Sequence, residues 1–420
     1  MIKTDKFVIN GVDSLNGSIK ISGSKNAALP IIAASLLACG ECRLKNIPSL
    51  TDISLMCDIL KCFGVSARTD GGVLIIDSSK IINNIAPYEL TGKIRGSFLV
   101  MGAMLSRCGR VRISLPGGCR IGARPVDLHL KGFSALGAKI SQGHGYIDVK
   151  AKELSGNRIY LDFPSVGATE NIMMAAVSAK GQTVIENASQ EPEIVDLANF
   201  LCAMGAKIYG AGTDYIRIDG AAVIKPCDYC IIPDRIEAGS FMAATAAVGG
   251  SVHLDGIVPS HLGAVAAKLS ELGAKLDFTE NSLDIVMSSR PGATDIKTLP
   301  FPGFPTDMQS QMSSVLSVAD GTSIITETIF ENRFMHAAEL TRMGACVKIE
   351  GQTCIIEGKK RLTGSKVRAS DLRAGAALTI AALAAKGKSE IYDIHHIERG
   401  YDRFEEKLSA LGADIRRVGE

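Results

Sequence analysis

The chain has 420 residues, with 46 lysines and arginines against 44 aspartates and glutamates, and a formal net charge of +2. This balance, without a basic stripe, argues against a nucleic-acid partner. A chain of this length is expected to form two or three domains. The apolar runs are too short to span a bilayer, and the start MIKTDKF lacks the apolar core of a signal peptide. We therefore expect a cytoplasmic protein with no membrane association.

In chain order, the segment KFVINGVDSLNGSIKIS comes first and reads as two strands joined by a loop. From there one pattern returns six times: a helix of small apolar residues, a glycine, a strand, an amphipathic helix, a second glycine and another strand. A period of about 70 residues exceeds that of solenoid repeats and gives each copy room for a small α/β layer. Six copies divide most simply into two groups of three. The first helices end at Gly40, Gly109, Gly181, Gly249, Gly321 and Gly387, and the second helices end at Gly64, Gly137, Gly205, Gly273, Gly344 and Gly412.

The first helix of each repeat is expected to be buried. It is apolar nearly all round in several copies, as in AALPIIAASLLACG from Ala27 and AGAALTIAALAAKG from Ala374. The second helix is amphipathic, and its final glycine suits a left-handed conformation. The sixth copy ends after one short strand, so we predict that residues 1–22 complete it and lie beside the C-terminal half.

Eleven cysteines favour reduced thiols over a disulfide framework. The two C-x-x-C pairs, Cys39 with Cys42 and Cys227 with Cys230, are far apart in the sequence and lack the neighbouring pair of a zinc ribbon. No metal site is therefore predicted. The adjacent His395 and His396 lie beside charged residues, where a surface role is the simpler interpretation.

Polar residues recur where the buried helices begin. Helix N-termini offer free N–H groups and the positive end of the helix dipole, so several of them with added lysine and arginine favour an anion. Each residue alone could be an exposed cap, but the recurrence predicts a site for an acidic, phosphorylated ligand. These residues are Lys25, Asn26, Arg95, Glu170, Asn171, Arg235, Glu237, Asp307, Asp371 and Arg373.

One loop breaks the repeat, ISLPGGCRIGARPVDLH from Ile113 to His129. Its glycines allow close approach to a ligand, and Arg120 and Arg124 flank Cys119 with positive charge that favours the thiolate. An inert loop cysteine is the alternative. Equivalent loops carry Glu191, Glu193, Arg333 and Arg399.

Seven phrases, taken in order, resemble the bacterial UDP-N-acetylglucosamine 1-carboxyvinyltransferase family from about residue 5 to the C-terminus. They are SGSKNAALP, LPGGCRIGARPVDLH, SVGATENIMMAA, ENASQEPEIVDLANFL, FPTDMQSQ, ETIFENRFMH and DLRAGAALTIAA.

The resemblance implies a two-domain inside-out α/β barrel of six β-α-β-α-β-β units, three per domain. Residues 23–234 would form the domain with the Cys119 loop, and residues 1–22 with 235–420 the domain with Asp307 and Arg399. The active site would lie in the cleft between them. The implied reaction transfers the enolpyruvyl group of phosphoenolpyruvate to the 3′-hydroxyl of UDP-N-acetylglucosamine, releases phosphate and opens peptidoglycan synthesis, with no cofactor.

The resemblance also assigns roles to residues. Cys119 would be the proton donor, the site of a covalent adduct with phosphoenolpyruvate and the target of fosfomycin, and Asp307 the base toward the sugar hydroxyl. Lys25, Arg124 and Arg399 would hold phosphoenolpyruvate, with Asn26 on the sugar side. The UDP-sugar positions match Arg95, Arg124, Pro125, Val126, Asp127, Leu128, Phe163, Pro164, Ser165, Val166, Gly167 and Ile329, and further active-site or closure positions match Arg333, Asp371, Leu372 and Arg373.

Phe163 departs from the pattern, because some family members have lysine there; phenylalanine could pack against the uracil. Two alternatives stay open. The shikimate-pathway enolpyruvyl transferase shares the fold, but it lacks the loop cysteine and would begin its first helix with GSKS where this chain has GSKNA. A non-catalytic sensor would need the cations but not the thiol.

Overall fold

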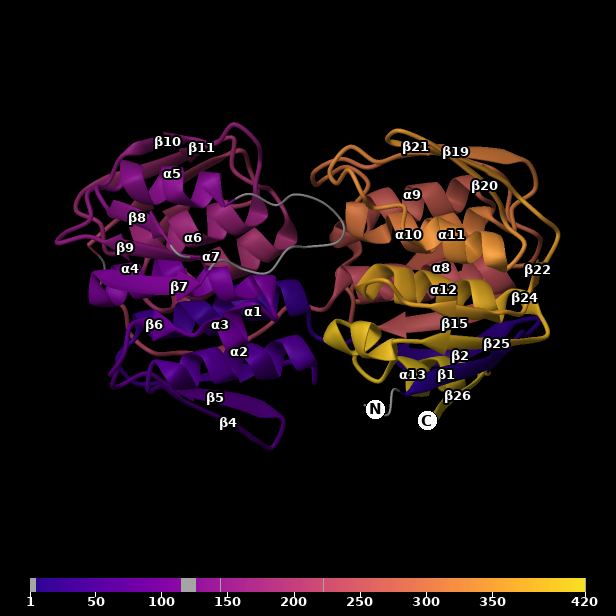
Figure 1. The fold of residues 1–420 in the computed structure, drawn as a ribbon, viewed down its shortest axis with the longest axis horizontal. Helices are drawn as coiled ribbons and strands as arrows, with labels where there is room; N and C mark the ends of the chain where they lie inside the picture. Colours follow the sequence, from indigo (N-terminus) through magenta and orange to yellow (C-terminus); the bar gives the residue numbers. More distant parts are fainter. Residues whose placement is uncertain (1–4, 115–125, 144, 222, 420) are drawn as a thin grey trace. The chain divides into compact units, whose positions relative to one another are not determined.

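The computed structural model describes residues 5–114, 126–143, 145–221 and 223–419. The chain divides into two compact units (Figure 1). The first unit consists of the described residues of 23–232, and the second of residues 5–22 and 233–419. Each unit has its own hydrophobic core.

The first unit contains three four-stranded sheets, ordered β14-β3-β5-β4, β6-β7-β9-β8 and β10-β11-β13-β12. Its strands are β3 (Glu41–Lys45), β4 (Ser66–Asp70), β5 (Val73–Asp77), β6 (Ile85–Ala86), β7 (Arg110–Ser114), β8 (Lys139–Gly143), β9 (Tyr146–Lys150), β10 (Arg158–Tyr160), β11 (Gln182–Glu186), β12 (Lys207–Tyr209), β13 (Tyr215–Asp219) and β14 (Asp228–Cys230). Its helices are α1 (Lys25–Ala34), η1 (Ser35–Leu37), α2 (Thr51–Cys62), α3 (Tyr88–Thr91), η2 (Arg95–Leu99), α4 (Val100–Cys108), α5 (Asp127–Ala135), α6 (Val166–Ala176) and α7 (Pro192–Ala203), where η marks 3₁₀ helices.

The second unit repeats this plan with the sheets β16-β17-β15-β2, β18-β19-β21-β20 and β23-β25-β1-β26, and adds a β22-β24 pair. Its strands are β1 (Lys6–Asn10), β2 (Leu15–Lys20), β15 (Gly250–Asp255), β16 (Lys275–Phe278), β17 (Ser282–Met287), β18 (Ile296–Lys297), β19 (Thr322–Thr326), β20 (Cys346–Glu350), β21 (Thr353–Glu357), β22 (Leu362–Thr363), β23 (Lys366–Arg368), β24 (Ala385–Lys386), β25 (Lys388–Tyr392) and β26 (Asp414–Val418). Its helices are α8 (Arg235–Val248), η3 (Pro259–His261), α9 (Gly263–Glu271), η4 (Thr306–Met308), α10 (Gln309–Leu316), α11 (His336–Arg342), α12 (Leu372–Leu383), η5 (Ile394–Arg399) and α13 (Phe404–Ala410).

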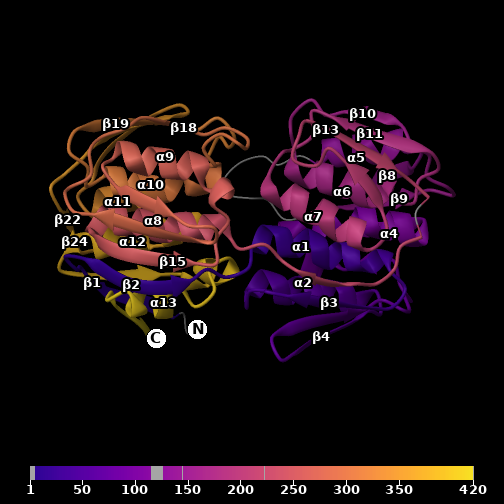
Figure 2. The ribbon, with the colours of Figure 1, turned by 180° about the vertical axis from the view of Figure 1, so that it is seen from behind.

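The first helix of every repeat lies inside its unit, with the sheets outside (Figures 1 and 2). Ala27–Ala34 of α1 and Arg373–Leu383 of α12 are buried throughout, as their apolar sequences predict. Helix α10 is buried although its sequence is QSQMSSVL. Two of its serine hydroxyls donate to backbone carbonyls, Ser313 Oγ to Gln309 O at 3.0 Å and Ser314 Oγ to Ala377 O at 2.7 Å, so burial leaves these hydroxyls satisfied. The expected fold class, a two-domain α/β fold with buried helices and outer sheets, is confirmed.

The glycines that end the second helices have φ between +88° and +109°, which confirms the predicted left-handed conformation. Among the described residues, none of the helices has both the length and the apolar character needed to cross a bilayer.

The two N-terminal strands, β1 and β2, belong to different sheets. Strand β1 lies between β25 and β26 and is antiparallel to both, so it completes the sixth repeat as predicted. The prediction is wrong for β2, which pairs in parallel with β15 of the fourth repeat. Strand β14, which precedes the fourth repeat's helix α8, pairs with β3 of the first repeat. In the other four repeats, the strand before the buried helix pairs in parallel with the strand after it.

Candidate active site

A cluster of three charged side chains in the second unit lies where helix α10 begins. Asp307 sits in η4, and its two carboxylate oxygens accept hydrogen bonds from Arg333 Nη2 and Arg373 Nη2, each at 2.7 Å. Both arginine side chains are about 5% exposed, at 4% and 5%, whereas that of Asp307 is 28% exposed. Burial raises the pKa of Asp307, but Arg373 and Arg333 outweigh it and hold this pKa well below its ordinary value. Asp307 is therefore ionised at neutral pH.

The cluster of Asp307 with its two arginines carries one net positive charge. Buried positive charge of this kind favours an anionic ligand. Arg333 Nε and Arg373 Nη1 are buried and find no hydrogen-bond partner in the part of the chain that the structure describes. Asp371 caps α12 by accepting from the backbone N–H groups of Arg373 and Ala374, and this cap fixes the helix start from which the Arg373 side chain projects.

A hydrogen-bond network of neutral side chains contacts Arg373. The guanidinium of Arg373 lies over the ring of Tyr401, 5.5 Å from its centre. The Tyr401 hydroxyl is 2.7 Å from Ser240 Oγ and accepts from Gln311 Nε2 at 3.0 Å. These bonds hold the aromatic ring in place, and with it the arginine that covers it.

In the first unit, Lys25 and Asn26 open helix α1, which Ser24 caps through its hydroxyl. Lys25 Nζ is 3.4 Å from Asp52 Oδ2, and the two side chains are 12% and 3% exposed. Asp52 thus holds a nearly buried ammonium group at a helix N-terminus, where both the charge and the helix dipole favour an anion.

The N-terminus of α6 is the second such place in this unit. Ser165 caps the helix, and Val166 and Gly167 form its first turn. A Cβ on Gly167 would lie 3.1 Å from His129 Cε1, so the absence of a side chain allows the imidazole to approach the helix.

Sequence reasoning did not single out His129. Its Nδ1 is 2.9 Å from Asn171 Nδ2, which can only donate, so Nδ1 accepts and a neutral ring carries its proton on Nε2. Burial, and then Arg95, lower the pKa of His129 to about 3. The imidazole is therefore neutral at physiological pH.

Asn171 joins three elements. Its Oδ1 accepts from Gly102 N of α4 at 2.7 Å, and its Nδ2 donates to Phe98 O of η2 at 3.1 Å as well as to His129. The side-chain amide thus occupies the place of one helical hydrogen bond between Gly102 and Phe98. In the same helix, burial and then Glu193 and Glu191 raise the pKa of Glu170 well above its ordinary value.

The predicted site residues fall at the starts of helices or in loops within each unit. Asp307, Arg333 and Arg373 are brought into contact, whereas Cys119, Arg124 and Pro125 lie outside the described residues. Arg95 opens η2, Val126 precedes Asp127 and Leu128 at the start of α5, Phe163 and Pro164 precede α6, Ile329 follows β19, Leu372 opens α12 and Arg399 ends η5. Two further residues support predicted positions: Asp52 pairs with Lys25, and His129 lies close to Gly167. Both are isolated polar residues that no sequence pattern indicates.

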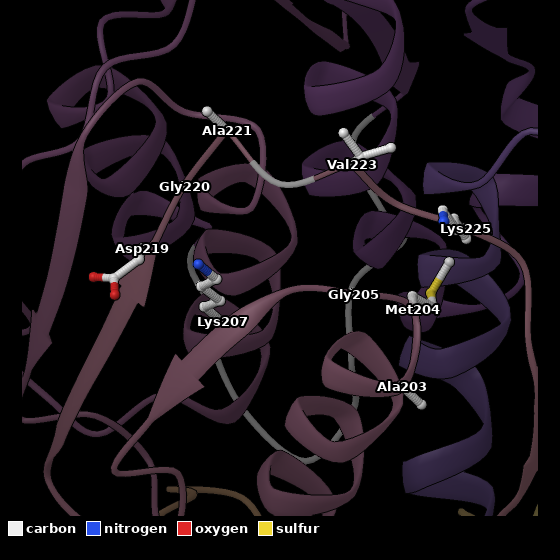
Figure 3. A pocket seen from close by; sticks show the side chains of 9 residues that line it. All are labelled: Ala203, Met204, Gly205, Lys207, Asp219, Gly220, Ala221, Val223 and Lys225. Carbon is white, nitrogen blue, oxygen red and sulfur yellow. The ribbon is translucent and has the colours of Figure 1, made fainter.

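A cavity of about 500 Å³ lies elsewhere in the first unit, between the end of α7 and the segment that follows β13 (Figure 3). Met204, Lys207, Asp219 and Lys225 are among the residues that line it. None of its lining residues is a predicted site residue.

The family model described as EPSP synthase (3-phosphoshikimate 1-carboxyvinyltransferase) matches residues 9–408. The chain therefore belongs to the EPSP synthase family of enolpyruvyl transferases.

Within this family, the chain is 57% identical to UDP-N-acetylglucosamine 1-carboxyvinyltransferase 1 of Caldanaerobacter subterraneus subsp. tengcongensis, over 98% of this chain and 99% of that protein. It is 56% identical to UDP-N-acetylglucosamine 1-carboxyvinyltransferase 2 of Carboxydothermus hydrogenoformans, over 99% of this chain and 100% of that protein. The resemblance read from the seven phrases is thereby confirmed.

Solved structures agree with the fold. The enolpyruvyl transferase NikO of Streptomyces tendae is similar with a TM-score of 0.89 and 25% identity, covering 100% of both chains. An EPSP synthase of Acinetobacter baumannii has a TM-score of 0.77 at 17% identity, covering 99% of this chain and 100% of that one, which is a likeness of fold alone.

Proposed function

We propose that this enzyme transfers the enolpyruvyl group of phosphoenolpyruvate to the 3′-hydroxyl of UDP-N-acetylglucosamine and releases phosphate, the step that opens peptidoglycan synthesis. The observation that carries the proposal is Asp307, held ionised by two buried arginines at a helix start. The relatives of more than 50% identity bear the name of this reaction.

The reaction is an addition followed by an elimination. The sugar oxygen bonds to C2 of phosphoenolpyruvate while a proton adds to C3; the C3 proton is then removed as phosphate leaves C2. In the proposal, Asp307 accepts the hydrogen bond of the attacking hydroxyl. A carboxylate with so low a pKa is a weak base, so we assign it orientation of the hydroxyl as much as proton removal.

The cations hold the two anionic groups of phosphoenolpyruvate. We assign Lys25, Arg124 and Arg399 to its phosphate and carboxylate, with Asn26 on the sugar side. Arginines bind such anions bidentately and stabilise charge that develops on addition. The nearly buried ammonium of Lys25 beside Asp52 supports this assignment.

The UDP moiety is assigned to the first unit. Arg95, the segment 124–128 and the segment 163–167 contribute, and the N-terminus of α6 receives the diphosphate. The Ser165 cap and the close approach that Gly167 allows support this part of the proposal. Ile329 is also assigned to the sugar.

Cys119 is assigned the proton donation to C3 and the covalent adduct with phosphoenolpyruvate. A thiol beside arginines can act as an acid or, as the thiolate, as a nucleophile, which also makes it the site of fosfomycin alkylation. We place the reaction in the cytoplasm. The ten cysteines in the described ranges are all free thiols, which supports a reducing compartment.

The test is phosphate release from phosphoenolpyruvate with UDP-N-acetylglucosamine, run beside the same assay with shikimate 3-phosphate, each with and without fosfomycin. We expect fosfomycin-sensitive release with the UDP-sugar alone. Cys119→Ala should abolish turnover, and Cys119→Asp should keep an acid and resist fosfomycin. Release only with shikimate 3-phosphate would assign the chain to that acceptor, and no release with either would favour a non-catalytic sensor.

A further inference from the structure

A buried carboxylate lies beside the segments that carry two of the proposed substrate contacts. Glu327 directly follows β19 and is 1% exposed. Its Oε1 accepts hydrogen bonds from Thr298 Oγ1 at 2.8 Å and from the backbone nitrogens of Ile329 at 2.9 Å and Phe330 at 3.3 Å. Its Oε2 accepts from Thr306 Oγ1 at 2.9 Å. One carboxylate thus accepts four hydrogen bonds.

These bonds connect three segments that are separate in the sequence. Thr298 follows strand β18, Thr306 immediately precedes Asp307, and Ile329 and Phe330 belong to the turn after β19. The turn is tied a second time to the β18 segment, because Thr328 N donates to Thr298 Oγ1 at 2.9 Å. Hydrogen bonds in a buried environment of low dielectric constant are electrostatically stronger than the same bonds in water.

The turn after β19 also reaches Asp307 directly, through the ion pair from Arg333. The Asp307 segment and the segment 327–333 are therefore joined at two points, by the bond from Thr306 to Glu327 and by the bond from Arg333 to Asp307. Two such ties fix both the position and the direction of the Asp307 carboxylate relative to Ile329.

We propose that Glu327 is a positioning residue for the transfer reaction. It sets the Asp307 carboxylate and the Ile329 turn at the spacing that the nucleotide sugar requires. This inference rests on the proposed function, in which Asp307 and Ile329 contact the same substrate. A displacement of about 1 Å at such a contact can cost a large factor in rate.

The test uses Thr306→Val, which removes one hydroxyl donor to Glu327 at nearly constant volume. We expect the KM for UDP-N-acetylglucosamine to rise about tenfold and kcat to fall, with the KM for phosphoenolpyruvate within about twofold of wild type. Thr306→Ser keeps the donor and should restore wild-type values. Glu327→Gln should shift the same constants in the same direction. Thr322→Val, on the exposed face of β19, is the matched control and should change nothing.

Wild-type constants in Thr306→Val would overturn the inference. So would equal increases in the two KM values with a lower melting temperature, since that result describes a purely structural bond. Asp307→Asn is measured in the same assay. If it loses turnover while Thr306→Val does not, the positioning role alone fails; if Asp307→Asn is fully active, both the inference and the assignment of Asp307 fail.

Discussion

Helices α6 and α10 hold equivalent places in the third and fifth repeats, yet their N-terminal ends differ in charge. The start of α6 lies beside a neutral imidazole, since burial and then Arg95 lower the pKa of His129 to about 3, and within the helix burial and nearby carboxylates raise the pKa of Glu170 well above its ordinary value. The start of α10 carries one carboxylate between two buried guanidiniums.

The difference shows that equivalent positions of a repeated fold can serve different functions. The repeat determines where helix N-termini lie, and therefore where N–H groups are available for an anion. The side chains then decide whether the place offers neutral donors, suited to holding a diphosphate, or formal charges, suited to a reacting hydroxyl and the charge that develops on it.

The largest expected effect comes from removing the charge at α10. In Asp307→Asn, two guanidiniums lose their common anion and the proposed hydroxyl acceptor becomes a neutral amide. We expect kcat for phosphate release to fall by at least about 100-fold, in the range typical of a positioned acid or base. Circular dichroism should show a folded protein; activity near wild type would remove Asp307 from the chemistry.

Arg373→Met tests the ion pairs that hold Asp307 at the start of α10. The wild-type pKa of Asp307 is depressed in the folded state, so its stabilisation is present above its unfolded pKa and is lost as pH falls through the folded value. With one arginine gone, the folded pKa of Asp307 rises toward its ordinary value and this stabilisation decreases. Acid unfolding should then begin at higher pH than in wild type, and an unchanged acid midpoint would contradict the account.

Asn171→Leu tests the buried hydrogen bonds that Asn171 of α6 makes. It leaves Gly102 N, Phe98 O and His129 Nδ1 without their present partner in the core. Unfolding in urea should show a loss of about 3 kcal/mol, because buried polar groups without partners are costly. Ser178→Ala, which removes a hydroxyl contact to Ser106 just beyond α6, is the control and should cost less than about 1 kcal/mol.

Gly167→Ala should have the smallest effect. Its Cβ would lie 3.1 Å from His129 Cε1, so the imidazole has to shift by a few tenths of an ångström. We expect stability within about 1 kcal/mol of wild type and a rise of a few-fold in the KM for UDP-N-acetylglucosamine. Gly263→Ala, where a Cβ at the start of α9 would meet open space, is the control. An unchanged KM in Gly167→Ala would show that the position of the His129 ring does not affect binding of the nucleotide sugar.

Much of this architecture could be predicted from the glycine series and the apolar helices, because periodicity reports burial directly. The exchange of β2 and β14 between repeats could not, since Asp228–Cys230 is short and its pairing partner lies far away in the sequence. Burial of α10 follows from its place in the repeat and not from its polar composition, because two of its serines bond to backbone carbonyls in a way that composition does not reveal.

Some residues of the candidate site could be predicted from the sequence, and others could not. Asp307, Arg333 and Arg373 could each be selected from the sequence, since charged residues beside buried helices are unusual. Their contact with one another, and the supporting Asp52, His129 and Glu327, depend on tertiary packing. Isolated polar residues of this kind carry no spacing signal, so only the structure identifies them.

The position of β1 has a consequence for biosynthesis. In the second unit, β1 lies between β25 and β26, so its sheet cannot close until the C-terminal strand has left the ribosome. The strands of the first unit all come from residues 23–232, and that unit can finish folding while the rest is still being made. Strand β1 is therefore synthesised long before both of its partners, and pairing at such sequence separation is intrinsically slow.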